Sequence, residues 1–218
     1  MYDILKKNSA FFFPYLLALL AGTSFLILWS RIDVSLFING HHNTVTDFFF
    51  TYWTDVGLGW LVIPVAIVLA FISFRYMLMA IICFLITFAV NDGIKFALHY
   101  PRPSVILDQL HQSFYHVPGV EVYEWDSFPS GHTAIAFGMF CLLALMATKP
   151  GMKFLFFIFA FLVGYSRIYL AEHFITDVMA ASVIGVTCAI FTYTLFTNWK
   201  AINTFAGIDK PLINLSGK

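Results

Sequence analysis

The sequence predicts an all-α membrane protein: a bundle of six transmembrane helices in one domain that covers residues 1–218. Hydrophobic residues make up 60% of the chain and charged residues 11%, whereas soluble proteins average about 45–50% and about 25%. Six apolar stretches approach the roughly 20 residues that a helix needs to cross the hydrocarbon core. The loops between these stretches are alternately rich and poor in basic residues, which is typical of a chain that crosses a membrane repeatedly.

The expected spans are uninterrupted apolar runs. The first follows Lys6 and Lys7, a pattern that also fits a secretory signal peptide. Its apolar run continues past Gly22 as far as Trp29, so a retained helix is the better interpretation. The six expected spans are Phe11–Trp29, Gly57–Phe74, Met77–Leu98, Ser130–Thr148, Phe154–Leu170 and Ile175–Trp199.

The basic residues set the expected orientation, because lysine and arginine concentrate in cytoplasmic loops. Eight of the twelve basic residues lie on one side of the six spans, which should be cytoplasmic. Both termini are then inside, in an inner or plasma membrane. The eight are Lys6, Lys7, Arg75, Lys149, Lys153, Lys200, Lys210 and Lys218. The four on the outer side are Arg31, Lys95, Arg102 and Arg167.

Two segments on the expected outer side are long. Residues 31–56 contain an aromatic cluster at 48–53, which fits either a segment lying flat at the membrane interface or an irregular surface loop. Residues 99–129 contain four prolines and Gly119, too many helix breakers for another span. We expect this second segment to cover a site on the outer face.

Composition also excludes some partners and cofactors. Twelve basic and twelve acidic side chains cancel, so no excess of positive charge favours nucleic acid as a partner. Cys83, Cys141 and Cys188 lie inside apolar runs without metal-ligand spacing, and we expect them to be small buried hydrophobic residues. Nothing in the sequence indicates the oligomeric state.

Ionisable residues at membrane depth are costly, so three polar clusters near the outer helix ends predict a site. In the first cluster, Lys95 lies at the end of the third span, where its long side chain can reach the interface. Arg102 stands between Pro101 and Pro103, which hold its guanidinium at the mouth of the helix. Both can face an anion, although Lys95 alone could be an ordinary interfacial lysine.

The second cluster, Pro129–His132, stands immediately before an apolar helix. The free N–H groups and the dipole of a helix N-terminus bind phosphate, and Gly131 would let a ligand approach the backbone. His132 can give or take a proton near neutral pH. Ser130 could alternatively be no more than a helix N-cap.

The third cluster contains Ser166 and Arg167, followed by His173 and Asp177. His173 and Asp177 are four residues apart, so they share one face of a continuous helix. There the carboxylate could orient the imidazole and stabilise its cation, which describes a nucleophile or base with its partner. A single pair of this kind is weak evidence, but it lies on the same predicted face as the other two clusters.

Together the clusters resemble the signature of the type 2 phosphatidic acid phosphatase superfamily, in its bacterial membrane branch. Residues 95–103 match K-x6-RP, residues 129–132 match PSGH and residues 166–177 match SR-x5-H-x3-D. The resemblance implies a six-helix core with the site at the outer surface. It also implies metal-independent hydrolysis of a phosphomonoester or diphosphate of a membrane lipid, through a phosphohistidine.

The same resemblance assigns roles to the motif residues. His173 would be the nucleophile, Asp177 would orient it, and His132 would protonate the leaving oxygen. The phosphate-binding residues would be Lys95, Arg102, Ser130, Gly131 and Arg167.

No cofactor or metal is expected. Phosphoryl transfer depends mainly on positioning and charge stabilisation, and three fixed cations can do what magnesium does elsewhere. No carboxylate cluster in the sequence suggests a metal site. We interpret the acidic neighbours Asp92, Asp126 and Glu172 as structural residues.

Two other functions fit parts of the pattern. A lipid carrier could use the phosphate pocket for binding only, but both histidines of the signature are present. A vanadium haloperoxidase could hold vanadate in the same pocket, but those relatives resemble soluble helical proteins. The expected partner is therefore a lipid phosphate in the outer leaflet.

For a bacterial chain the resemblance implies four candidate lipids: undecaprenyl diphosphate, phosphatidylglycerol phosphate, phosphatidic acid and the phosphates of lipid A. The chain is short and has no appended domain, which favours undecaprenyl diphosphate or a broad substrate range.

The orientation leads to a labelling prediction. A cysteine introduced after Pro103 should react with a membrane-impermeant thiol reagent in intact cells, because the basic residues place this segment outside. A cysteine that replaces Lys149 should react only after lysis. Protection of the first position until lysis would contradict the predicted orientation.

Overall fold

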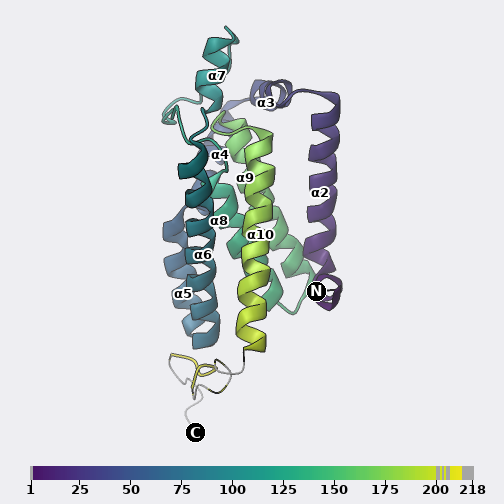
Figure 1. Ribbon diagram of the computed structural model, residues 1–218, viewed down its shortest axis with the longest axis vertical. Coiled ribbons are helices and arrows are strands. Elements are labelled where there is room, and N and C mark those ends of the chain that lie inside the picture. The colour runs from purple at the N-terminus through teal and green to yellow at the C-terminus, as the bar shows by residue number, and fades with distance from the viewer. Residues whose placement is uncertain (1, 200–201, 203, 205–206, 213–218) are drawn as a thin grey trace.

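The computed structural model describes residues 2–199, 202, 204 and 207–212, and this part of the chain is helical, without β-strands (Figure 1). The predicted all-α fold is confirmed. Lys200 and Lys218, which entered the orientation argument, lie outside the described residues. The elements are α1 (Tyr2–Lys7), α2 (Ser9–Leu28), α3 (Arg31–Gly40), α4 (Thr44–Trp53), the 3-10 turns η1 (Thr54–Gly57) and η2 (Gly59–Leu61), α5 (Val62–Ala70), α6 (Phe74–Leu98), α7 (Pro103–Gln109), α8 (Gly131–Met146), α9 (Pro150–Tyr169) and α10 (Ile175–Asn198).

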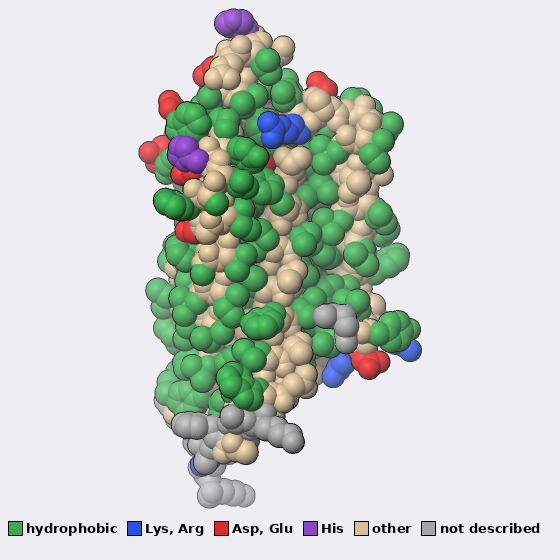
Figure 2. Space-filling view, in the orientation of Figure 1, with side chains coloured by type: hydrophobic (Ala, Val, Ile, Leu, Met, Phe, Trp, Pro, Cys, Tyr) green, Lys and Arg blue, Asp and Glu red, His purple; other side chains and the backbone are tan. Residues whose placement is uncertain are grey.

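The chain is an integral membrane protein. Among the described residues, four segments are long and apolar enough to cross a bilayer, namely α2, α6 with α7, α9 and α10. The pair Thr44–Gly57 and Gly59–Ala70, bent by 62°, would add a fifth span if it crosses as one unit, and α8 is apolar but shorter. The number of six therefore stays a prediction. In Figure 2 hydrophobic side chains cover the middle of the visible face, while charged side chains gather toward the two ends.

One expected span differs from the structure. Residues 57–74 were expected to form a continuous helix, but this stretch begins in the turns η1 and η2, and α5 covers only Val62–Ala70. The other five expected spans coincide closely with α2, α6, α8, α9 and α10. Residues 31–56 form α3 and α4, and α3 lies across the end of the bundle (Figure 1).

Helix α8 packs against α6, α9 and α10, and small residues permit its closest approach. A Cβ atom built on Gly185 of α10 would lie 2.7 Å from the backbone nitrogen of Gly138 in α8. Close van der Waals packing of this kind holds helices together in a bilayer, where the hydrophobic effect between helices is absent. The three cysteines are buried and free, as expected: Cys83, Cys141 and Cys188.

Polar contacts define the two ends of the bundle. At one end, Lys153 at the start of α9 donates to Asn8 Oδ1 at 2.5 Å. At the same end, Arg75 at the start of α6 donates to the carbonyl of Phe196 near the end of α10 at 2.6 Å. We call this the far end. The opposite end, where α6 and α9 finish and α8 and α10 begin, carries all three motif clusters and is called the site end.

Candidate active site

The motif residues come together at the site end, each placed by a helix terminus. Lys95 lies in the last turn of α6, and Arg102 directly precedes α7. Gly131 begins α8, and Arg167 lies in the last turn of α9. His173 lies in the turn between α9 and α10. Helix ends therefore deliver three cationic side chains and an imidazole to one region.

Glu172 joins the two arginines of the signature. Its Oε2 accepts hydrogen bonds from Arg102 Nη1 and from Arg167 Nη2, the latter at 3.3 Å. Arg102, Arg167 and Glu172 are only 9%, 5% and 5% exposed, so an uncompensated charge here would be costly. Burial raises the pKa of the Glu172 carboxyl, and the two arginines oppose that shift. Glu172 therefore links the two arginines that are predicted to bind phosphate, which fits its interpretation as a structural residue.

Further contacts orient each guanidinium. Arg102 Nε donates to the carbonyl of Trp125 at 2.8 Å, and the Arg102 backbone nitrogen donates to the carbonyl of Glu124 at 2.7 Å. Arg167 Nη1 donates to Thr54 Oγ1 at 2.7 Å. Arg167 Nε is buried and has no hydrogen-bond partner among the described residues. This buried donor is therefore free of acceptors from the described part of the chain.

A second group of donors surrounds the start of α8. A Cβ atom on Gly131 would lie 3.8 Å from Lys95 Nζ and 3.7 Å from Asn91 Nδ2. Asn91 is 2% exposed, and within the described part of the chain neither of its side-chain polar atoms has a partner. The backbone N–H groups of the first turn of α8 have no intrahelical acceptor. Lys95, Asn91 and the start of α8 thus offer several donors in one place.

The side chain of Ser130 is not an ordinary N-cap. The residue is fully buried, and its Oγ accepts from Thr133 Oγ1 at 2.9 Å instead of from a backbone N–H of α8. Its own backbone nitrogen donates to the carbonyl of Asp177 at 3.3 Å, which ties the start of α8 to the start of α10. The alternative that Ser130 only caps α8 is therefore not supported by its contacts.

His132 occupies the first turn of α8, in the tightest packing of the site. A Cβ atom on Gly57 of η1 would lie 2.7 Å from the carbonyl oxygen of His132. Any larger residue at position 57 would push η1 and α8 apart. A cavity of about 120 Å³ lies beside His132, with Phe88 and Ile135 among its lining residues.

The pair His173 and Asp177 is close but not hydrogen-bonded. His173 Nδ1 lies 3.8 Å from Asp177 Oδ2 and has no hydrogen-bond partner among the described residues. Asp177 Oδ2 instead accepts from Ser127 Oγ at 2.6 Å and from the Phe174 nitrogen at 3.0 Å. Burial lowers the pKa of His173, and Asp177 opposes that shift. A neutral imidazole beside a carboxylate is the state that a nucleophilic histidine needs.

The turn that carries His173 is held by its backbone. The nitrogens of Glu172 and His173 donate to the carbonyl of Arg167 at 3.0 and 3.1 Å. Ala171 adopts a φ of 55°, a left-handed conformation that costs a residue other than glycine roughly 1–2 kcal/mol. The surrounding contacts must maintain this conformation, and they fix Arg167, Glu172 and His173 relative to one another.

A polar network attaches the predicted covering segment to this turn. Asn39 of α3 is buried, and its Nδ2 donates to the carbonyls of Tyr115 and Tyr169, both at 2.9 Å. Asp47 of α4 accepts hydrogen bonds from the hydroxyls of the same two tyrosines. The roles of Asn39 and Asp47 could not be predicted, because burial and partners distant in the chain are not visible in the residue type. Residues 99–129 are thus attached to the site end through Tyr115, and their role as a cover stays a prediction.

The charges of the site act on one another. The imidazole of His132 lies within electrostatic range of Arg167, His173, Arg102 and Lys95. No group of three or more His, Cys, Asp or Glu side chains in the described part of the chain could hold a metal ion. Of the other acidic neighbours, Asp126 pairs with His99 at 2.8 Å on the surface, and Asp92 lines the small cavity.

The family described as PAP2 superfamily matches residues 75–201. The chain belongs to the PAP2 superfamily. A curated relative, the "Bacitracin transport permease protein BcrC" of Bacillus licheniformis, is 38% identical over 95 residues, which are 40% of this chain and 46% of the relative. The matched part thus spans about half the length of that relative.

Two solved structures resemble this member of the PAP2 superfamily. LpxE of Aquifex aeolicus has a TM-score of 0.66 at 28% sequence identity, over 74% of this chain and 93% of that protein. A PAP2-type phosphatidylglycerolphosphate phosphatase of Bacillus subtilis has a TM-score of 0.55 at 20% identity, over 94% of this chain and all of that protein. The second likeness supports the PAP2 fold alone.

The contacts of Glu172 predict how this PAP2 site binds anions. Glu172→Gln should tighten the binding of orthovanadate and inorganic phosphate by about tenfold or more, because it removes a negative charge from the two guanidiniums while keeping an acceptor. Binding is measured by the thermal shift of the purified protein during titration. Glu121→Gln, which removes a nearby exposed charge, should change the affinity little. Unchanged or weaker anion binding in Glu172→Gln would refute the prediction.

Proposed function

We propose that this protein is an integral membrane lipid phosphatase, which hydrolyses a phosphomonoester or diphosphate of a membrane lipid through a phosphohistidine and without a metal. The observation that carries the proposal is the gathering of two histidines and three cationic side chains at one end of a membrane-spanning bundle. Membership of the PAP2 superfamily supports it. A carrier would need the cations but has no use for a buried histidine beside a carboxylate.

The reacting phosphoryl group would lie between the two groups of donors. Arg102 and Arg167 approach it from one side, while Lys95 and the start of α8 at Gly131 approach it from the other. Buried, preorganised donors stabilise the charge of a phosphoryl transition state more than water does. Asn91, with both polar atoms unpartnered, joins Ser130 as a further neutral group within this cradle.

The first step is attack by His173 on phosphorus. Because Nδ1 is turned toward Asp177, Nε2 is the nitrogen that forms the bond. As the N–P bond forms, the bond from phosphorus to the lipid oxygen breaks, and His132 gives that oxygen a proton. Asp177 stabilises the positive charge that develops on the His173 ring.

The second step releases phosphate. Water attacks the phosphohistidine, His132 takes a proton from that water, and the N–P bond breaks with its electron pair returning to His173. Inorganic phosphate leaves, and both histidines regain their starting protonation states. One residue can act as the acid in the first step and as the base in the second, because it gives a proton to the lipid oxygen and then takes one from water.

The proposed orientation places the site end at the outer face. Helix α2 begins and α10 finishes at the far end, and the described basic residues Lys6, Lys7, Arg75, Lys149 and Lys153 belong to that end. Such residues favour the cytoplasm. A lipid in the outer leaflet would then present its phosphate at the depth of the site, with its tail leaving through the apolar cavity beside His132.

Purified protein in detergent should release inorganic phosphate from at least one of four lipids: undecaprenyl diphosphate, phosphatidylglycerol phosphate, phosphatidic acid and lipid A. We expect undecaprenyl diphosphate among its substrates. Activity should persist in EDTA, because three cations already supply the charge stabilisation, and vanadate should inhibit it. Loss of turnover in EDTA with recovery on adding magnesium would contradict the charge scheme, and inactivity toward all four lipids would contradict the proposed function.

The two histidines should differ in their response to the leaving group. His173→Ala should abolish activity toward every substrate, since a nucleophile is needed whatever departs. His132→Ala should be severely impaired on a lipid alkyl phosphate yet retain far more of its activity on p-nitrophenyl phosphate, whose acidic leaving group needs little protonation. Turnover of both substrates is measured in the same detergent.

The comparison requires folded variants, which equal thermal unfolding temperatures would establish. Phosphohistidine should accumulate in His132→Ala, because His132 is also the base for the water. If His173→Ala were the variant rescued by the better leaving group, the two roles would have to be exchanged.

A further inference from the structure

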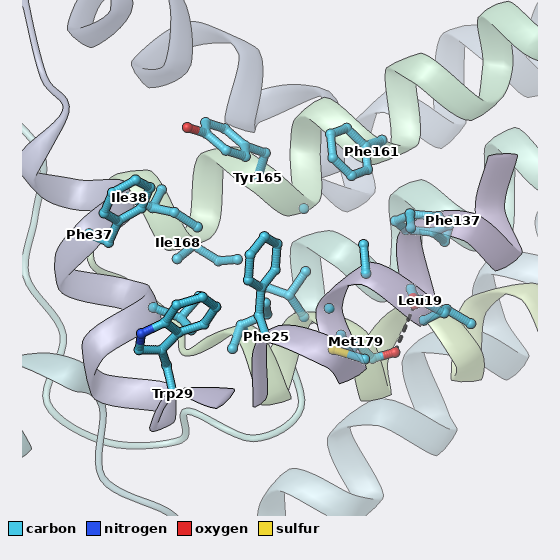
Figure 3. A pocket seen from close by; sticks show the side chains of 18 of the residues that line it. Leu19, Phe25, Trp29, Phe37, Ile38, Phe137, Phe161, Tyr165, Ile168 and Met179 are labelled. Carbon is cyan, nitrogen blue, oxygen red and sulfur yellow. Dashed lines mark hydrogen bonds between the residues drawn. The ribbon is translucent and has the colours of Figure 1, made fainter. Parts of the chain in front are cut away.

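A second cavity, unrelated to the motif residues, opens between α2, α3, α9 and α10. It has a volume of about 950 Å³, near the upper end of the range of about 300–1,000 Å³ for sites of small ligands. We call it the α2 groove. Ala18, Ala21 and Gly22 form its wall on α2, while Phe161 and Ile168 of α9 stand opposite. Figure 3 shows the lining side chains facing a common space. The groove shares no lining residue with the cavity beside His132.

The walls of the α2 groove offer almost nothing to a polar ligand. Of the lining residues, only Asp33 and Tyr165 have side chains that can ionise. The carboxylate is already engaged, since Asp33 Oδ2 accepts from the nitrogen and the hydroxyl of Ser30 at the start of α3. The hydroxyl of Ser182 donates to the carbonyl of Met179 at 2.7 Å. The interior therefore suits hydrocarbon.

The rim of the groove at the site end is different in character. Arg31, the first residue of α3, is exposed, and its guanidinium carbon lies 4.5 Å from the centre of the Phe174 ring. No acidic side chain in the described part of the chain forms an ion pair with it. Trp29 stands at the same rim, half exposed. In Figure 2 basic atoms stand out on this face near the site end of α10. An arginine and a tryptophan above an apolar space match the depth of lipid headgroups.

We propose that the α2 groove binds an anionic phospholipid, with its acyl chains between α2 and the α9–α10 pair and its phosphate on Arg31. The positive charge of Arg31 matches a phosphate, and the apolar walls match acyl chains; an anionic phospholipid has both groups. A helix of a second copy fits less well, because a spanning helix needs about 20 residues, whereas α3 crosses the site end of the groove and contributes Val34 and Phe37 to its lining. A lipid chain can end beneath its headgroup at that point.

The proposed site is separate from the reacting phosphate, but it touches the same turn. Phe174, on which Arg31 rests, directly follows His173, and Ile175 and Val178 of α10 line the groove. A bound lipid would fill the space behind the start of α10. Binding to this site does not depend on the proposed phosphatase function and can be measured without substrate.

The test uses the full-length protein in nanodiscs of phosphatidylcholine that contain a small fixed fraction of bromine-labelled lipid. Bromine on the acyl chains quenches tryptophan at contact, and the signal of Trp29 is the difference between the wild type and Trp29→Phe. Brominated phosphatidylglycerol should quench Trp29 at roughly fivefold lower fraction than brominated phosphatidylcholine, the preference expected from one basic residue near an anionic headgroup.

Two variants with matched controls separate the parts of the proposal. Arg31→Gln should remove the preference for phosphatidylglycerol, whereas Lys149→Gln, which removes a basic charge at the far end, should leave it unchanged. Ala21→Phe should weaken quenching by both lipids because it fills the groove, whereas Leu20→Phe, on the exposed face of α2, should not.

Equal quenching by the two lipids in the wild type would overturn the proposal, since it would mean an unselective apolar surface. Absence of quenching by either lipid would also overturn it, because the groove would then be closed or filled by protein. A preference that survives in Arg31→Gln would show that the anion is bound elsewhere, with the same consequence.

Discussion

Arg102 and Arg167 come from distant parts of the chain, yet both donate to one carboxylate oxygen of Glu172. Two guanidiniums brought together inside a protein repel each other, and burial removes most of the hydration of each. The shared carboxylate removes both penalties. Glu172 also fixes the local backbone, because it lies between Arg167 and His173 in a turn whose nitrogens donate to the carbonyl of Arg167. The entry to α7, the end of α9 and the start of α10 are fixed together.

The same carboxylate limits how strongly the site can hold an anion. A phosphate that binds between the arginines must share them with Glu172 or displace it. A residue next to His173 in the chain would thus oppose tight binding of the phosphate and favour its release.

Most of the helical architecture could be predicted from the sequence, because long apolar runs are also the physical requirement for crossing a bilayer. The start of α5 could not. Residues 57–61 contain Gly57 and Gly59 in an otherwise apolar stretch, and the sequence does not show how closely Gly57 approaches the backbone of His132. Segment 31–56 contained usable signals, since capping boxes at Ser30 and Asn43 mark the starts of α3 and α4.

The sequence predicted the motif residues of the candidate site but not the residues that support them. The motifs identified the histidines and the cationic residues, because the proton transfer and the positive charge that the chemistry needs are properties of these residue types. The supporting residues Asn91, Thr54 and Asn39 could not be found this way, since their contribution comes from burial and from partners distant in the chain. The His173 and Asp177 pair shows the limit of spacing arguments: four residues apart predicts proximity, but not the 3.8 Å gap or the competing donors Ser127 and Phe174.

The contacts of Thr54 and Gly57 bear on how members of this superfamily could be recombined. Both residues precede residue 75, where the family match begins, yet one holds Arg167 and the other packs on His132. In a hybrid chain joined at residue 75, Arg167 and His132 would both contact residues from a different protein. A junction placed before residue 54 would keep Thr54 with Arg167 and Gly57 with His132. The exchanged part would then consist of α1 to α4. It would include the groove wall on α2 but not η1, which supports His132 of α8.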